Sequence, residues 1–268
     1  MEVAAELLNL QVTSIDLSRL SSNTAWLNDQ IINAGLASLF LRHKSRDANK
    51  LIVFSSYFYE MLRGKNGVPK IVGENFHGNR NPLKRNIFLA DALISPVNLA
   101  GNHWALLVVH FETQTLCLYN SIPRYDEVGM ECLLKYKELL AFTYRIRNKQ
   151  PLPSTWRCQI MMDAQVQMGD CDCGVFVCRY FESILQSCSS LSTLPNCANV
   201  FGAVNPGEYR KYLQRIIECE LNASRLYGSD RYLVFLLFLV KSCPRVGLTS
   251  KIPMLSRGIL KRLVLFLG

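Results

Sequence analysis

The stretch QMGDCDCGVFVCRYFE, residues 167–182, puts Cys173 at the predicted start of an amphipathic helix. Gly174 follows, and apolar residues then recur at helical spacing, at Val175, Cys178, Phe181 and Leu185. Unpaired N–H groups at a helix N-terminus carry partial positive charge, so they favour a thiolate and can lower the pKa of a cysteine. Cys173 is therefore a candidate nucleophile, although most cysteines of intracellular proteins are small buried hydrophobic residues.

Cysteine catalysis also needs a base, a group that orients the base, and donors for the oxyanion. Among the four histidines we favour His103, which follows a Gly-Asn turn at the start of a predicted apolar strand. Asn120 ends the next predicted strand, and a hairpin turn within residues 111–114 would bring it beside His103. Taken singly, the two are also compatible with a solvated histidine and a turn asparagine. The other histidines lie at a helix end, in a glycine-containing loop and late in a strand (His43, His77 and His110).

The apolar pattern predicts helices before and after a group of antiparallel strands, which is the α+β class. Asn28 can cap a helix over residues 28–42. We expect further helices at 51–62, 128–144, from 173 onward and at 209–221, strands at 87–97, 104–111 and 116–119, a short polar segment at 12–25, and loops at 64–86 and 187–206.

With 268 residues the chain can form one substantial core, which we assign to a catalytic domain over residues 1–222. A basic, apolar tail of uncertain structure follows at 223–268. Its apolar run at 232–240 is far shorter than the ~20 residues that span a bilayer. The run could rest on an anionic membrane surface, but a buried strand or helix, or a doubtful gene model at the C-terminus, is favoured over membrane contact.

Composition and charge favour an intracellular protein that does not bind nucleic acid. The formal charge is +9, but eight basic residues and one acidic residue follow Asn222, so seven of the nine net positive charges lie in the tail. The nearly neutral remainder argues against nucleic acid as a partner. The ten cysteines are scattered, and the N-terminus has no secretory pattern. We therefore expect reduced thiols and an intracellular location, in the nucleus or the cytoplasm.

Four motifs together resemble the sentrin/SUMO-specific (Ulp-type) cysteine proteases over roughly residues 10–222. They are Trp-Leu-Asn-Asp at 26–29, His-Trp at 103–104, Leu-Tyr-Asn-Ser at 118–121, and Gln167 six residues before Cys173. The resemblance implies a papain-like cysteine protease fold, with helices flanking a central, mostly antiparallel sheet. It also implies hydrolysis after the C-terminal Gly-Gly of a ubiquitin-like modifier, with no metal or organic cofactor.

The resemblance assigns a role to each candidate catalytic residue. It makes Cys173 the nucleophile, His103 the general base and later acid, and Asn120 the third member of the triad. Gln167 becomes the side-chain donor of the oxyanion hole, together with the backbone N–H of Cys173. Gln165 is a rival for this role, but its offset from Cys173 does not match the family pattern.

The resemblance also assigns substrate-binding residues. Trp26 and Trp104 would clamp the diglycine, because only residues without Cβ pass through a flat slot between two indoles. Asp29 would lie at the exosite that holds the body of the modifier. From periodicity alone, Trp26 is instead a hydrophobic staple on the following helix.

Asn120 departs from the family, which usually has Asp at this place. An amide can accept the same imidazole N–H bond but supplies no charge, and such a replacement in serine proteases lowers turnover about 10⁴-fold. Because papain-like Cys-His enzymes work with Asn, we expect an active enzyme, although its turnover could be lower. A module that binds a ubiquitin-like protein and has lost turnover is the alternative.

Two further points are open at the level of sequence. SUMO is the favoured modifier, with NEDD8 or ubiquitin as alternatives, and we expect a monomer. A zinc site using Cys171, Cys173, Cys178 and Cys188 is a weaker hypothesis, because the spacing lacks paired Cys-x-x-Cys knuckles.

Overall fold

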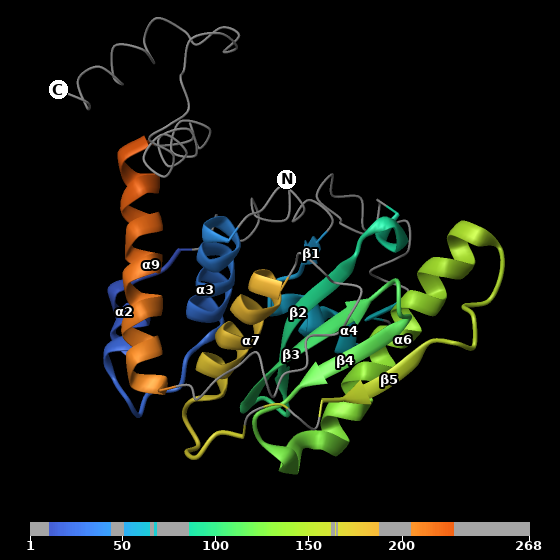
Figure 1. Ribbon diagram of the computed structural model, residues 1–268, viewed down its shortest axis with the longest axis horizontal. Helices are drawn as coiled ribbons and strands as arrows, with labels where there is room; N and C mark the ends of the chain where they lie inside the picture. The colour runs from blue at the N-terminus through green and yellow to red at the C-terminus, as the bar shows by residue number, and fades with distance from the viewer. Residues whose placement is uncertain are drawn as a thin grey trace, which may run out of the picture. The chain divides into compact units, whose positions relative to one another are not determined.

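The five strands of the described residues form one sheet, in the order β1-β2-β3-β4-β5 (Figure 1). The central strands β2, β3 and β4 are antiparallel, as predicted, whereas β1 pairs with β2 and β5 with β4 in parallel. The strands are Leu51–Val53 (β1), Ala92–Leu99 (β2), His103–His110 (β3), Thr115–Tyr119 (β4) and Arg157–Ile160 (β5).

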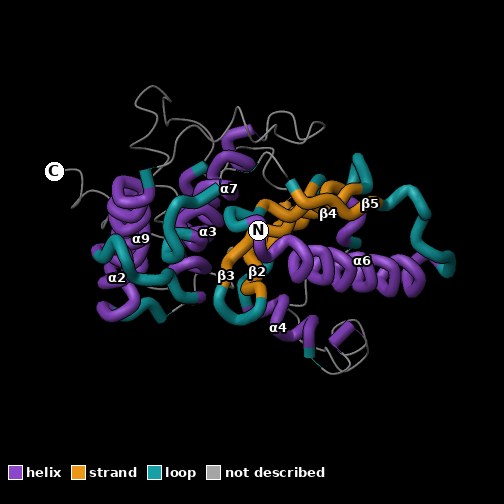
Figure 2. Tube along the Cα trace, turned by 90° about the horizontal axis from the view of Figure 1, so that it is seen from below, coloured by secondary structure: helices purple, strands orange, loops and turns teal. Residues whose placement is uncertain are grey.

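Helices cover both faces of this sheet, which confirms the α+β class. Helices α4 and α6 pack on one face, and α7 packs on β3 from the other face and against α3 (Figure 2). The helices are Ser14–Ser21 (α2), Asp29–Arg42 (α3), Tyr57–Arg63 (α4), Asp126–Asn148 (α6), Cys173–Ser187 (α7) and Pro206–Tyr227 (α9), with 3₁₀ turns at Ile87–Leu89 (η3) and Pro123–Tyr125 (η4).

Strand β3 is buried on both faces, so its sequence is a continuous apolar run instead of an alternating one. Ala105, Leu107 and Val109 belong to the core that β2, β4, α4 and α6 share. Leu106 and Val108 point to the opposite face and are also fully buried. A strand held from both sides is a rigid base for the residue at its start, His103.

The computed structural model describes residues 11–43, 51–64, 67–68, 86–161, 164, 166–187 and 205–227. The chain divides into two compact units, Met1–Glu220 and Leu221–Gly268. The elements above belong to the first unit, apart from the end of α9. Most of the predicted loop at 64–86, nearly all of the predicted connection at 187–206, and the apolar run at 232–240 lie outside the described residues.

One local prediction differs from the structure, and two elements, α2 and β5, were not predicted. The helix predicted over 51–62 begins only at Tyr57, because Leu51–Val53 pairs with β2 as an edge strand. The segment at 12–25 contains α2, whose capping box joins Thr13 and Asp16. Strand β5 was also not predicted, because it has only four residues and they are only partly buried.

The strand predicted at 87–97 begins with the 3₁₀ turn η3 and becomes extended from Ala92. The strands predicted at 104–111 and 116–119 and the helices predicted at 28–42, 128–144, from 173 and at 209–221 are confirmed within a few residues.

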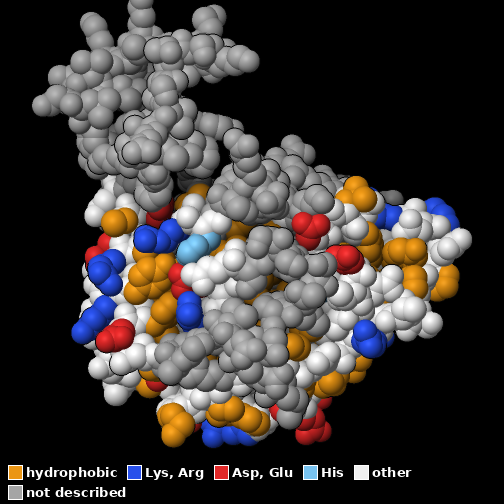
Figure 3. Space-filling model, viewed as in Figure 1, with side chains coloured by type: hydrophobic (Ala, Val, Ile, Leu, Met, Phe, Trp, Pro, Cys, Tyr) orange, Lys and Arg blue, Asp and Glu red, His pale blue; other side chains and the backbone are white. Residues whose placement is uncertain are grey.

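On the face shown in Figure 3, Lys and Arg side chains of the described residues are interspersed with Asp and Glu. The described part of this face therefore has no continuous basic stripe. Among the helices that the structure describes, none combines the length and apolar character that crossing a bilayer requires.

Candidate active site

Cys173 is the first residue of α7, as predicted. The backbone carbonyl of Asp172 accepts a hydrogen bond from the Phe176 N–H at 3.0 Å, which begins the helix. A Cβ added to Gly174 would lie 2.9 Å from the Cβ of Leu27, just before α3. Glycine after the cysteine therefore lets the first turn of α7 pack directly against the chain leading into α3.

Arg210 of α9 holds the turn that leads into Cys173. Its guanidinium is fully buried and donates to the carboxylate of Asp172 at 2.9 Å and to the carbonyls of Cys171 at 2.9 Å and Arg19 at 3.0 Å. A guanidinium suits this task because its planar fork of donors can bind several acceptors at once. Sequence reasoning missed Arg210, because nothing in an amphipathic helix distinguishes it from a surface arginine.

His103 and Asn120 meet as predicted. The hairpin turn lies within residues 111–114, with His110 paired to Thr115, and Nε2 of His103 lies 2.7 Å from Oδ1 of Asn120. Both side chains are buried. The other ring nitrogen of His103, Nδ1, is buried and has no hydrogen-bond partner among the described residues. The imidazole therefore has one nitrogen fixed by the amide and one free to exchange a proton.

The Cys173 thiol lies beside Trp104, the residue that follows His103. It accepts a hydrogen bond from the backbone N–H of Trp104, and further N–H bonds from Gly174 and from its own backbone. Two elements distant in sequence, the start of β3 and the start of α7, thus lie side by side, and Cys173 contacts the residue next to His103.

Burial decides the charge state of this pair. It raises the pKa of the Cys173 thiol, and the three backbone N–H groups lower it only in part. The helix-terminus effect predicted from the sequence is thus present but smaller than desolvation. Burial also lowers the pKa of His103, the Asn120 hydrogen bond raises it in part, and the Arg124 charge lowers it further. The free protein therefore favours a neutral thiol at Cys173 and a neutral imidazole at His103.

Gln167 is joined to the end of β4. Its Oε1 accepts from the Ser121 hydroxyl at 2.8 Å, its backbone N–H donates to the Ser121 carbonyl at 3.0 Å, and its Nε2 donates to the Gly169 carbonyl. Because Ser121 follows Asn120, Gln167 lies next to the candidate triad. One of its two amide hydrogens remains for another acceptor. Its rival, Gln165, lies outside the described residues.

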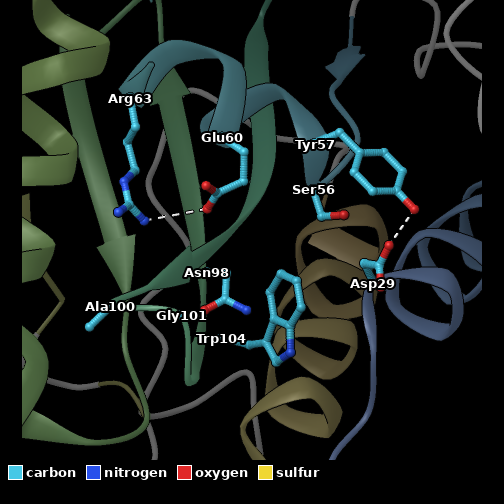
Figure 4. A pocket seen from close by; sticks show the side chains of 9 residues that line it. All are labelled: Asp29, Ser56, Tyr57, Glu60, Arg63, Asn98, Ala100, Gly101 and Trp104. Atoms are coloured by element: carbon cyan, nitrogen blue, oxygen red, sulfur yellow. Dashed lines mark hydrogen bonds and ion pairs between the residues drawn. The ribbon is translucent and has the colours of Figure 1, made fainter. Parts of the chain in front are cut away.

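Trp104 and Asp29, two of the predicted substrate-binding residues, line one pocket of about 460 Å³ (Figure 4). The indole of Trp104 is almost buried, and its Nε1 donates to the Leu27 carbonyl at 2.9 Å. The third such residue, Trp26, precedes Leu27, and its side chain is 47% exposed. A half-exposed indole can contact a ligand, whereas the indole of a buried hydrophobic staple could not.

Asp29 is not a free carboxylate at the wall of this pocket. The hydroxyl of Tyr57 donates to it, and the two side chains point toward each other in Figure 4. Burial, with the neighbouring Asp29 as a second cause, raises the pKa of Tyr57 to about 12. Ser56, Glu60 and Arg63 line the same pocket, so it presents charges of both signs.

Tyr125 is a second residue that sequence reasoning missed. Its ring stacks on the imidazole of His103, with centroids 4.4 Å apart and planes 19° from parallel. The guanidinium of Arg124 lies 5.3 Å from the centre of the Tyr125 ring. The position belongs to the short turn η4, and no pattern in the sequence singled it out.

The cysteines of the alternative zinc site have different partners. The Cys171 thiol donates to the Asn23 carbonyl at 3.2 Å, Cys173 faces Trp104, and Cys178 is fully buried against Gly35. Among the described residues no three His, Cys, Asp or Glu side chains are grouped so that they could hold a metal ion. Cys188, the fourth cysteine of that hypothesis, lies outside them.

The chain is similar in sequence to sentrin-specific proteases. Sentrin-specific protease 2 of Homo sapiens is 27% identical over 188 residues, covering 68% of this chain and 29% of its own length. Sentrin-specific protease 5 of Mus musculus is 30% identical over 169 residues, covering 62% and 20%. The chain therefore spans less than a third of the length of these relatives.

Solved structures share the fold. The C-terminal Ulp1 protease domain in complex with Smt3, the yeast ortholog of SUMO, has a TM-score of 0.58 at 18% identity, covering 81% of this chain and 93% of that one. A de-sumoylating protease has a TM-score of 0.59 at 16% identity, with 84% and 93% covered. The Xanthomonas campestris effector XopD bound to ubiquitin has a TM-score of 0.51 at 17% identity, with 72% and 92% covered.

Residues 25–197 match the Ulp1 protease family, C-terminal catalytic domain. This match contains Trp26, His103, Asn120, Gln167 and Cys173, which are the residues whose geometry is described above. Since it extends over more than half of the sequence, the chain belongs to the Ulp1 protease family.

Proposed function

We propose that the protein is a cysteine protease that hydrolyses the peptide or isopeptide bond after the C-terminal Gly-Gly of a ubiquitin-like modifier. One observation carries the proposal. The Cys173 thiol is bonded to the N–H of Trp104, the neighbour of His103, and the ring of His103 is bonded to Asn120. These contacts support a catalytic group made of a nucleophile, a base and a residue that orients the base, as nucleophilic catalysis requires.

In the proposed reaction Nδ1 of His103 takes the thiol proton of Cys173 as the sulfur attacks the carbonyl carbon of the terminal glycine. The second amide hydrogen of Gln167 and the backbone N–H of Cys173 stabilise the oxyanion. His103 then donates its proton to the departing amine as the C–N bond breaks. Water, deprotonated by His103, hydrolyses the thioester and releases the modifier carboxylate and the thiol. No step uses a metal or an organic cofactor.

The burial of the candidate catalytic residues favours a substrate whose C-terminal end carries no bulky side chains. The side chains of Cys173 and His103 are almost completely covered, and Trp104 is 8% exposed. A chain segment that reaches the sulfur has little room for side chains, which favours glycine. We assign the flat walls of the passage to Trp26 and Trp104, and the contact with the body of the modifier to the surface around Asp29.

SUMO is the favoured modifier. Relatives of this chain are named sentrin-specific proteases, and a Ulp1 domain of the same fold binds the yeast SUMO. The effector XopD, also of this fold, was solved with ubiquitin, so ubiquitin and NEDD8 remain the alternatives. Related sites of this fold can therefore accept different modifiers, and the surface outside the triad selects among them.

The test is a panel of SUMO, NEDD8 and ubiquitin, each activated at its C-terminus with a fluorogenic leaving group. We expect the wild-type chain to cleave the SUMO substrate fastest, and Cys173→Ala to reduce cleavage at least 10³-fold. The serine variant of Cys171, the neighbouring thiol, is the matched control and should keep most of the activity. Cleavage that survives in Cys173→Ala would contradict the assignment of the nucleophile.

A catalytically weakened module that binds a ubiquitin-like protein is the second candidate, and Asn120 is the feature that favours it. A SUMO derivative with an electrophile at its C-terminal glycine separates the two candidates. An enzyme forms a covalent adduct at Cys173, whereas a binding module binds the derivative without reacting. Mass spectrometry of the mixture detects the difference.

We assign this activity to a catalytic domain over residues 1–222 that acts as a monomer inside the cell, in the nucleus or the cytoplasm. The described cysteines are all free thiols, which suits a reducing compartment. Size-exclusion chromatography with light scattering would test the monomer, and a chain truncated after Asn222 that retains activity would support the domain limit.

A further inference from the structure

Asn120 lies where the family usually has a carboxylate, and both the oxygen and the nitrogen of its side-chain amide make hydrogen bonds. Its Oδ1 accepts from Nε2 of His103 at 2.7 Å and from the Ile122 N–H at 3.1 Å. Its Nδ2 donates to the Ile122 carbonyl at 2.8 Å and to the carboxylate of Asp126 at 2.6 Å. Turning the amide over would place NH₂ against an N–H, and oxygen against two acceptors. The partners therefore fix Oδ1 toward the imidazole.

This orientation selects one tautomer of His103. The amide oxygen can only accept, so Nε2 of the imidazole must carry the hydrogen. The lone pair of the neutral ring then lies on Nδ1, the nitrogen without a hydrogen-bond partner among the described residues. That is the protonation state that a general base for Cys173 requires.

Asp126 is the one charged side chain in this set of contacts. It belongs to the first turn of α6, and its carboxylate accepts a charge-assisted hydrogen bond from Asn120. A negative charge behind the NH₂ group also polarises the amide, which makes the oxygen facing His103 a stronger acceptor.

We propose that Asp126 is a positioning residue that orients the Asn120 amide. Through this amide it supplies to His103 the negative charge that the Asp of the family supplies by direct contact. The proposal rests on the proposed function. Within it, Asn120 is not a defect in the triad but one half of an Asn120–Asp126 pair that replaces a single carboxylate.

The pair makes an unexpected prediction for the variant that restores the usual residue of the family. In Asn120→Asp the second carboxylate oxygen would face both the Ile122 carbonyl and the Asp126 carboxylate at hydrogen-bond distance, with no proton between them. We therefore expect Asn120→Asp to lower kcat about 10²-fold instead of raising it.

Exchanging the two residues should restore activity. In the double variant Asn120→Asp, Asp126→Asn the amide at position 126 can donate to the carboxylate at position 120, which removes the repulsion from Asp126 and leaves only the Ile122 carbonyl facing it. We expect kcat within about tenfold of the wild type. Asp126→Asn alone keeps an acceptor but loses the charge, and should lower kcat about tenfold with little change in KM. Glu127→Gln, an exposed acid on the same helical turn, is the matched control and should stay within twofold.

The experiment measures kcat and KM of these variants on the SUMO substrate, with circular dichroism to confirm folding. It also records ¹⁵N–¹H correlation spectra of the His103 ring, which report the tautomer without any substrate. We expect a protonated Nε2 and a bare Nδ1 in the wild type, and a larger share of the other tautomer in Asp126→Asn.

Three results would overturn the proposal: Asn120→Asp as active as the wild type, a double variant no faster than Asn120→Asp, or unchanged ring-nitrogen signals in Asp126→Asn. If the wild type cleaves no modifier, the proposed function fails. The ring spectra then still decide whether Asp126 sets the tautomer, so the two failures are distinguishable.

Discussion

Strand β3 begins and ends with a buried histidine, and the two differ in their surroundings. His103 is bonded to Asn120 and stacked on Tyr125, and the residue that follows it, Trp104, reaches the Cys173 thiol with its backbone N–H. His110 has no hydrogen-bond partner for its Nε2 among the described residues, and burial alone lowers its pKa to about 4. Burial makes both rings neutral. Only His103 has a partner that selects one tautomer, and in the proposed mechanism Cys173 is the nucleophile that this ring activates.

The largest expected effect comes from exchanging each histidine in turn. His103→Gln should lower kcat/KM for the SUMO substrate about 10³-fold or more, because it removes the proposed general base for Cys173. His110→Leu should leave kcat/KM within about twofold, since His110 lies at the opposite end of the strand. The measurement is steady-state cleavage at neutral pH. Comparable losses in both variants would show that the ends of β3 do not differ in function.

The donors at the His103 end give the next effect. Gln167→Ala should lower kcat about 10²-fold, because it removes the proposed side-chain donor to the oxyanion and leaves only the backbone N–H of Cys173. Ser121→Ala should lower kcat less than Gln167→Ala does, because it removes the hydrogen bond that holds the Gln167 amide but leaves the amide itself in place. Equal losses in the two variants would mean that Gln167 serves only to hold the loop at 166–170.

Much of this site could be predicted from sequence, because its parts depend on local patterns. A cysteine before the apolar stripe of α7 and a histidine before the apolar run of β3 both lie at ends of elements, where periodicity locates them. The contact between His103 and Asn120 followed from the length of one hairpin. These relations span few residues, so spacing alone constrains them.

What could not be predicted depends on contacts between elements far apart in the chain. Arg210 is separated by almost forty residues from the turn that it holds, and Tyr125 lies in an irregular turn. The helix terminus lowers the pKa of Cys173 as expected, but burial raises it more, and the depth of burial around Cys173 is a tertiary property that local patterns do not reveal. The half-buried edge strand β5 was missed for the same reason, since its pairing with β4 overrides a weak local pattern.

Acid should weaken the fold through His110. In the unfolded chain this histidine takes up a proton near its ordinary pKa of about 6.5, whereas in the folded protein it stays neutral down to about pH 4. Between these values the unfolded state binds more protons, so the free energy of unfolding falls as the pH falls, by about 3 kcal/mol in total. Urea denaturation at pH 7 and near pH 4.5 measures this loss.

His110→Leu should remove most of the pH dependence that His110 causes, because leucine fills the site without a titrating group. His103 contributes a loss of the same sign, since burial lowers its pKa too. A wild-type protein and a His110→Leu variant with equal acid sensitivity would show that His110 is not the buried neutral group responsible.

The smallest expected effect concerns the ring that covers the base. Tyr125 stacks on His103 with 4.4 Å between ring centroids, and a contact of this kind contributes about 0.5–1.5 kcal/mol. Tyr125→Leu should therefore lower kcat about three- to tenfold, by loosening the imidazole and admitting water beside it. Tyr125→Phe keeps the ring and should keep the activity. Full activity in Tyr125→Leu would mean that Asn120 alone orients His103, and the difference between the two ends of β3 would then rest on hydrogen bonding and not on stacking.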